Sequence, residues 1–269
     1  MDGDSTMRNL TMSLISTLLA ALFGNANAHE FWIQPESYSI NSDQVLRLSL
    51  MHGERFLGDP VTRNNGYIQR FECVGVDATT DIRGLDGHTT SFARPSGSGG
   101  QILVYHSQEF TNMLEAGRFR AYLREEGLDG IIQRRAELGE SDMPGRETYS
   151  RCAKSLITIG DAPIPADRAV GLPLELVLGA VGPDGAIHAR VLLHGTPAPG
   201  LRVVAVRQAD PSEIREAITD QNGAVQFQGG EAGAWMLTSL HMERATNEHT
   251  ADWRSYWASL TMHINRKQQ

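Results

Sequence analysis

The sequence predicts a mainly β protein made of two antiparallel β-sandwich-like domains, with a short helical insertion near residues 117–139. Three observations lead to this fold class. Short apolar runs rich in valine, isoleucine and leucine alternate with Gly, Pro and Asn turn signals, as in sandwich proteins. A single stretch with helical spacing of apolar residues interrupts them. A proline-rich connector, DAPIPAD at 161–167, divides the patterned chain in two.

The first patterned part, residues 29–160, is expected to be an N-terminal β-rich domain. Within residues 117–139, apolar residues recur near helical spacing, and Gly127 and Gly130 predict a split into two short helices. Strand-like runs stand before and after this insertion, at 45–50, 102–105 and 155–159.

The second part, residues 161–269, is expected to be an antiparallel β-sandwich, because short strand-like runs recur between Gly- and Pro-containing turns. In one of these runs, side-chain alternation predicts that Trp235, Leu237 and His241 share one face. The runs lie at 174–178, 189–193, 201–207, 224–227, 234–240 and 258–262.

The first 28 residues predict a signal peptide. Arg8 precedes an uncharged apolar run at 10–23, and a small-x-small cleavage motif then ends at Ala28. The run is too short to cross a bilayer, which needs about 20 apolar residues. We therefore expect a mature chain that begins at His29, is periplasmic or secreted and has no stable membrane insertion. The alternative for the apolar run is a buried N-terminal helix or a membrane anchor. The start of translation is either Met1 or Met7.

Charge and cysteine content narrow the possible partners. The formal net charge is −8, and arginines are scattered without a basic cluster, which argues against nucleic acid and anionic membranes as partners. Metal cations and neutral partners are easier to accommodate. Cys73 and Cys152 either form a disulfide in an oxidising compartment or remain two buried free thiols.

The most specific chemical feature is a histidine at the expected new N-terminus. The α-amine and ring nitrogen of His29 can chelate one metal ion, and one further imidazole completes a histidine brace suited to copper, nickel or cobalt. His241, at the end of a strand-like run, is the expected partner, and His106 is the second choice. Asp252, in the polar loop that follows, completes the predicted metal site. The alternative is that each histidine is structural.

Other catalytic motifs are absent from the sequence. It contains no Gly-x-Ser-x-Gly elbow, phosphate loop or dinucleotide fingerprint, and no Cys-x-x-Cys or His-x-x-x-His pair. Four tryptophans are present, which either form a carbohydrate platform or pack in the core.

Several segments of the mature chain carry a family resemblance. They are HEFWIQP at 29–35, ERFLG at 54–58, YLREEGL at 122–128, YSRCAKSL at 149–156, GLPLEL at 171–176 and DWRSYWASLT at 252–261. They resemble a NikM-like family of secreted bacterial proteins, described as the periplasmic component of cobalt/nickel ABC uptake. Residues 191–200 and 219–223 resemble prealbumin-like or carboxypeptidase-regulatory-like sandwich modules.

Together these features predict a periplasmic transition-metal-binding protein. It would bind nickel, cobalt or copper through His29, His241 and Asp252, and the resemblance implies delivery to an inner-membrane metal importer. One alternative is a copper-dependent oxidative enzyme with a histidine brace, which is less favoured because no further likeness to such enzymes is seen. A metal-free module that binds carbohydrate or protein is the other alternative.

Overall fold

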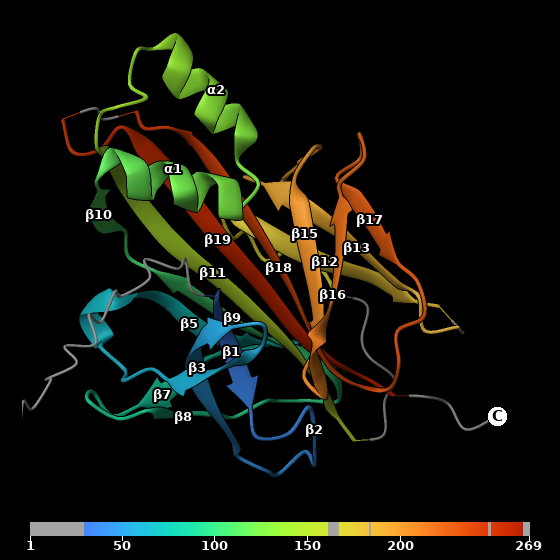
Figure 1. Cartoon of the computed structure of the whole chain (residues 1–269). Coiled ribbons are helices and arrows are strands. Elements are labelled where there is room, and N and C mark those ends of the chain that lie inside the picture. The colour runs from blue at the N-terminus through green and yellow to red at the C-terminus, as the bar shows by residue number, and fades with distance from the viewer. Residues whose placement is uncertain (1–29, 161–166, 183, 247–248, 266–269) are drawn as a thin grey trace, which may run out of the picture.

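The computed structural model describes residues 30–160, 167–182, 184–246 and 249–265 (Figure 1). The predicted signal peptide, His29 and most of the proline-rich connector lie outside these residues. The described chain is mainly β, with multiple antiparallel sheets and two short helices, which confirms the predicted fold class.

Within the described residues, the middle layer is a sheet of ten strands, here called the central sheet. Its main path runs through β16 (Asp210–Ile218), β15 (Arg202–Arg207), β18 (Gly233–Arg244), β19 (Trp253–Ile264), β11 (Gly145–Ile159), β9 (Gly99–Ser107), β5 (Ile68–Val74) and β6 (Thr79–Asp81). Two further strands pair with β11, namely β10 (Phe110–Leu114) and β2 (Ser39–Ile40).

Two smaller sheets cover opposite faces of the central sheet (Figure 1). The N-terminal sheet contains β1 (Glu30–Pro35), β3 (Leu46–Glu54), β4 (Leu57–Pro60), β7 (Arg83–Gly84) and β8 (Thr90–Ala93), and a 3₁₀ turn (Asn65–Tyr67) follows β4. The C-terminal sheet contains β12 (Leu174–Val181), β13 (Ile187–Leu193), β14 (Thr196–Pro197) and β17 (Ala224–Phe227).

Strand alternation explains this three-layer arrangement. On β11, Ala153 and Ile157 pack against the N-terminal sheet, whereas Cys152 and Leu156 pack against the C-terminal sheet. A central strand that is apolar on both faces must be covered on both sides, because each exposed apolar face would cost hydrophobic free energy. The two predicted sandwiches therefore share their middle sheet.

The predicted helical insertion forms α1 (Ala116–Glu125) and α2 (Asp129–Glu137). Helix α1 ends where expected, because Gly127 adopts a left-handed conformation with φ of 69°. The amide of Leu128 then donates to the carbonyl of Leu123 at 2.8 Å, the bond of a Schellman motif. Phe119 and its neighbours pack on β18 and β19 through a cluster that includes Trp253. The helices therefore cover the end of the central sheet that the N-terminal sheet leaves free (Figure 1).

Cys73 and Cys152 are buried free thiols, which decides between the two expected alternatives. Cys73 packs in the core beneath the N-terminal sheet and Cys152 in the core beneath the C-terminal sheet. Because the central sheet lies between them, they cannot pair. Burial raises the pKa of both thiols to about 12, so neither is a reactive thiolate at neutral pH.

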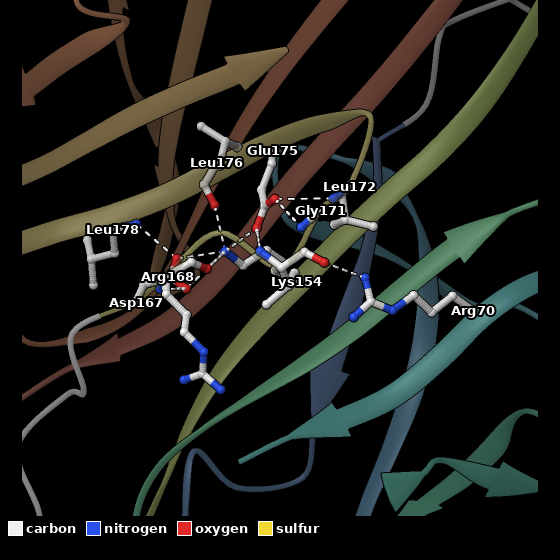
Figure 2. Close-up of polar contacts among 10 residues, drawn as sticks. Arg70, Lys154, Asp167, Arg168, Gly171, Leu172, Glu175, Leu176 and Leu178 are labelled. Carbon is white, nitrogen blue, oxygen red and sulfur yellow. Dashed lines mark hydrogen bonds and ion pairs between the residues drawn. The ribbon is translucent and has the colours of Figure 1, made fainter. Parts of the chain in front are cut away.

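A buried ion cluster fixes the chain that leads into β12 (Figure 2). The ammonium of Lys154, on β11, lies 2.9 Å from Asp167 and 3.0 Å from Glu175. Asp167 also accepts the amides of Arg168 and Leu178. Glu175 accepts three successive amides, those of residues 170, 171 and 172. Every carboxylate oxygen is therefore satisfied, as a buried charge requires.

We predict that Lys154→Met lowers the free energy of unfolding by roughly 3–5 kcal/mol, because it leaves Asp167 and Glu175 buried without the nitrogen that contacts both of them. Urea denaturation monitored by tryptophan fluorescence measures the loss. The matched control is Arg124→Met, at an exposed position on α1, which should change stability by less than about 0.5 kcal/mol. Equal small losses of unfolding free energy in the two variants would show that the ion cluster does not stabilise the fold.

Candidate functional site

A cavity of about 350 Å³ opens beside Glu30, the first described residue. Its walls come from β1, the β3–β4 hairpin, the turn between the two helices, and strands β15, β16, β18 and β19. This volume is at the lower end of the range for small-molecule sites. The polar and charged lining residues are Glu30, Glu54, Arg55, Glu125, Glu126, Arg202, Glu216, Thr238 and Ser239, and the apolar ones include Phe31, Leu128, Val204, Leu240 and Trp257.

The β3–β4 hairpin forms one wall and is conformationally strained. Arg55 and Phe56 both have left-handed backbone angles, with φ of 54° and 63°, which cost roughly 1–2 kcal/mol per non-glycine residue. The buried ring of Phe56 offsets part of this cost by packing edge-on against Trp32 at 5.6 Å. Its amide donates to the Glu30 carboxylate at 3.3 Å. The hairpin thereby holds Glu30 at the cavity wall.

Glu126 has the most strongly perturbed carboxylate in the cavity. Burial raises its pKa to about 7; the charge of Arg202 opposes this shift, and repulsion from Glu30 adds to it. Burial also raises the pKa of Glu30. A nearby cation favours the charged form of a carboxylate whose ionisation is opposed by burial and by a neighbouring carboxylate.

The two arginines of the cavity do not neutralise the negative charge of its glutamates. Arg202 is paired with Glu216 at 2.7 and 3.1 Å and also donates to the carbonyl of Glu125 at 2.8 Å. Arg55 is paired with Glu54 at 3.2 Å. Five glutamates and two arginines line the cavity, so its formal charge is −5 + 2 = −3 when all are ionised. The cavity therefore favours cationic ligands.

Trp257, on β19, contributes an aromatic wall. Its ring stacks on Tyr122 of α1 at 6.1 Å, and the guanidinium of Arg151 lies 4.9 Å from its centroid. The Tyr122 hydroxyl donates to the buried carboxylate of Glu147 at 3.0 Å. These contacts hold the indole in one orientation at the cavity surface.

His241, the predicted metal partner, lies on the other face of the central sheet from the cavity. Trp235 and Leu237 pack beneath the C-terminal sheet, whereas Leu240 packs against the helices, so alternation along β18 directs His241 toward the C-terminal sheet, on the face it was predicted to share with Trp235 and Leu237. The imidazole is partly buried, and its Nε2 lies 3.5 Å from a Glu243 oxygen. Burial lowers the pKa of His241, and the carboxylate of Glu243 partly opposes that shift.

Asp252, the third predicted ligand, is occupied by an ion pair. Arg146 donates to its two carboxylate oxygens at 2.7 and 3.1 Å, and these bonds lower its pKa. Arg244, three residues beyond His241 on β18, is opposite Trp253, which directly follows Asp252. Three residues along a strand span roughly 10 Å. The structure therefore does not bring Asp252 and His241 together.

His106, the second-choice partner, lies on β9 opposite Arg70, away from the cavity lining. Burial lowers its pKa. Among the described residues, no group of three His, Cys, Asp or Glu side chains could hold a metal ion. His29 lies outside them, so its predicted role remains a prediction.

Sequence reasoning missed Glu30 and Glu126 as site residues. Their importance comes from burial and, for Glu126, from the charge of Glu30, which no local pattern reveals. Two sequence signals nevertheless pointed to this region. Gly127 predicted the helix end that positions Glu126, and the ERFLG segment at 54–58 carried part of the family resemblance.

We predict that Gly53→Ala destabilises the protein by about 1–3 kcal/mol, the usual range for forced overpacking. A Cβ on Gly53 would lie 2.0 Å from the carbonyl oxygen of Leu57, so the hairpin must shift. The control is Gly117→Ala in α1, where a Cβ meets nothing within 4 Å. This control should gain about 0.5–1 kcal/mol. Thermal denaturation of both variants checks the predicted opposite signs.

In the part of the chain that the structure describes, no helix is long and apolar enough to cross a membrane. No curated protein matches the sequence. Among solved structures, the D0-D1 domain of intimin is 10% identical, over 87% of this chain and 97% of that chain, with a TM-score of 0.22. A tetra-tandem repeat in the extending region of a large adhesion protein is 13% identical, over 89% of this chain and 50% of that chain, with a TM-score of 0.23. We draw no functional parallel from TM-scores this low.

A family match is found over most of the sequence. Residues 26–243 match the model of a domain of unknown function, DUF4198. This span covers well over half of the 269 residues. The chain therefore belongs to the DUF4198 family.

Proposed function

We propose that this protein binds a transition-metal ion outside the cytoplasm, at a mature N-terminus that begins with His29 and adjoins the acidic cavity. The observation that carries the proposal is the position of Glu30 in the cavity wall. One peptide bond joins Glu30 to His29, and successive Cα atoms are about 3.8 Å apart. Cleavage after Ala28 would therefore create a free α-amine beside the cavity.

The donor set suits a transition metal. His29 would supply its α-amine and ring nitrogen, and Glu30 and Glu126 would supply carboxylate oxygens. Mixed nitrogen and oxygen ligands fit nickel, cobalt and copper. Because the central sheet separates His241 from the cavity, we assign the remaining ligands to these carboxylates instead of to His241 and Asp252.

The family resemblance also supports the proposal of transition-metal binding. The NikM-like segments imply cobalt or nickel uptake, in which the protein would pass its ion to an inner-membrane importer. A cavity lined by five glutamates and two arginines concentrates cations near its mouth. The metal is thus the cargo of the protein.

We predict that one extra alanine before His29 weakens nickel, cobalt or copper binding at least tenfold. The extension converts the α-amine into an amide, which removes one nitrogen donor and breaks the chelate ring. Isothermal titration of the mature protein and of the extended form, matched in folding by circular dichroism, measures the difference. Equal affinities would exclude the N-terminal site. Metal-dependent oxidation of a polysaccharide in the presence of ascorbate would instead favour the enzyme alternative.

We also predict that Glu126 contributes to a rise of metal affinity with pH up to about 7, in addition to the rise caused by deprotonation of the α-amine and imidazole of His29. A carboxyl with a raised pKa stays protonated below that value, and the ion must displace its proton, which costs up to about tenfold in affinity per pH unit. Glu126→Gln should weaken binding at pH above 7 and make the rise of affinity below pH 7 less steep, while the contribution of the His29 nitrogens remains. Glu125→Gln removes the same charge from the neighbouring exposed residue. Identical pH profiles in the two variants would exclude Glu126 as a ligand.

A further inference from the structure

The buried cation of the ion cluster is a lysine in a chain that almost exclusively uses arginine. The sequence contains 24 lysines and arginines, and the only lysines are Lys154 and Lys267. Arginine stays charged in proteins and does not act as a nucleophile, whereas a dehydrated lysine can lose its proton and attack a carbonyl carbon. The choice of lysine at position 154 therefore permits chemistry that the other cationic side chains do not.

The Lys154 amine lies against the carboxyl group of Asp167 in a site that excludes water (Figure 2). The side chains of Lys154, Asp167 and Glu175 are 1%, 0% and 2% exposed. Lys154 Nζ lies 2.9 Å from each oxygen of Asp167, so it faces the Cγ carbon that joins them. Glu175 Oε1 lies 3.0 Å from the same nitrogen.

We propose that Lys154 and Asp167 condense to an intramolecular amide, with Glu175 as the proton acceptor. The bond between Lys154 Nζ and Asp167 Cγ forms, and one Cγ–O bond of Asp167 breaks. Of the three ammonium hydrogens, one remains on the amide nitrogen. The other two leave with the released oxygen as water, one of them by way of Glu175. Charges balance, because one ammonium and one carboxylate give a neutral amide, and no oxidant or reductant takes part.

The surroundings favour each step. Burial raises the pKa of Asp167 and so favours its neutral, electrophilic form. The amides of Arg168 and Leu178 donate to different oxygens of Asp167, at 2.8 and 2.9 Å, so the oxygen that remains as the oxyanion of the tetrahedral intermediate keeps one amide donor. Attack requires the nitrogen to leave the carboxylate plane, which the broad terminal torsion of aspartate allows.

Proximity and burial supply the driving force. Fixing two reacting groups in contact replaces a bimolecular step with an intramolecular one of high effective molarity. The product exchanges two buried charges for a neutral amide, which removes their desolvation cost. The cross-link also ties β11 to the chain entering β12, in a protein whose two cysteines lie on opposite sides of a sheet.

The experiment is intact-mass spectrometry of the purified mature protein. We expect the wild type to be lighter than its sequence by one water molecule, and Lys154→Arg to have its full sequence mass. Asp167→Asn should reach the same product mass as the wild type, because the same amide forms with loss of ammonia. Proteolysis of the wild type should release a branched peptide that joins Lys154 to Asp167.

A second measurement requires no variant. After complete denaturation, an amine-reactive reagent should label Lys267 but not Lys154 of the wild type. A wild type at its full sequence mass, with Lys154 labelled after denaturation, would overturn the proposal and leave the cluster as a buried ion pair. Neither measurement involves a metal, so the outcome is independent of the proposed function.

Discussion

The parallel pairing of β11 with β19 is the constraint on which the rest of the structure depends. It runs from Glu147 opposite Trp253 to Ser155 opposite Thr261, so it joins residues more than a hundred positions apart. Two parallel strands cannot be joined by a tight turn. The chain between them is used to build the C-terminal sheet and the strands that extend the central sheet. One long-range pairing thereby unites the two patterned parts of the sequence.

This pairing also positions both features for which we propose chemistry. On one face, the register places Trp257 beside Arg151, which orients the aromatic wall of the cavity. On the other face, Lys154 meets Glu175 of β12. Alternation along β11 sends adjacent side chains to opposite layers. The cavity and the ion cluster therefore occupy opposite sides of one strand pair and can be altered separately.

The local parts of the fold could be predicted from the sequence. Apolar alternation identified most long strands and correctly grouped Trp235, Leu237 and His241 on one face of β18, and Gly127 marked the end of α1. The order of the sheets could not be predicted, because strand pairing depends on side chains distant in sequence. Whether Cys73 and Cys152 form a disulfide could not be predicted for the same reason, since only the order of the sheets places them on opposite sides of the central sheet.

The candidate site was less predictable than the fold, for a related reason. A free N-terminal histidine follows from a cleavage motif, so sequence alone suggests His29. Glu126 becomes a candidate ligand because burial and repulsion from Glu30 raise its pKa, and both effects depend on tertiary structure. The alternation that was predicted for β18 itself directs His241 away from the cavity once the sheet order is known.

If the protein is exported as proposed, the metal site and the Lys154–Asp167 amide would form at the same stage. In the uncleaved precursor, the nitrogen of His29 is an amide and cannot serve as the proposed metal donor. An amide between Lys154 and Asp167 likewise requires the folded contact between two residues that are 13 positions apart in the sequence. If the chain is exported before it folds, both chemistries occur after export. Cleavage of the proposed signal peptide would expose the amine of His29, and folding brings Lys154 against Asp167 and excludes water, so under both proposals the metal site and the cross-link would be completed outside the cytoplasm.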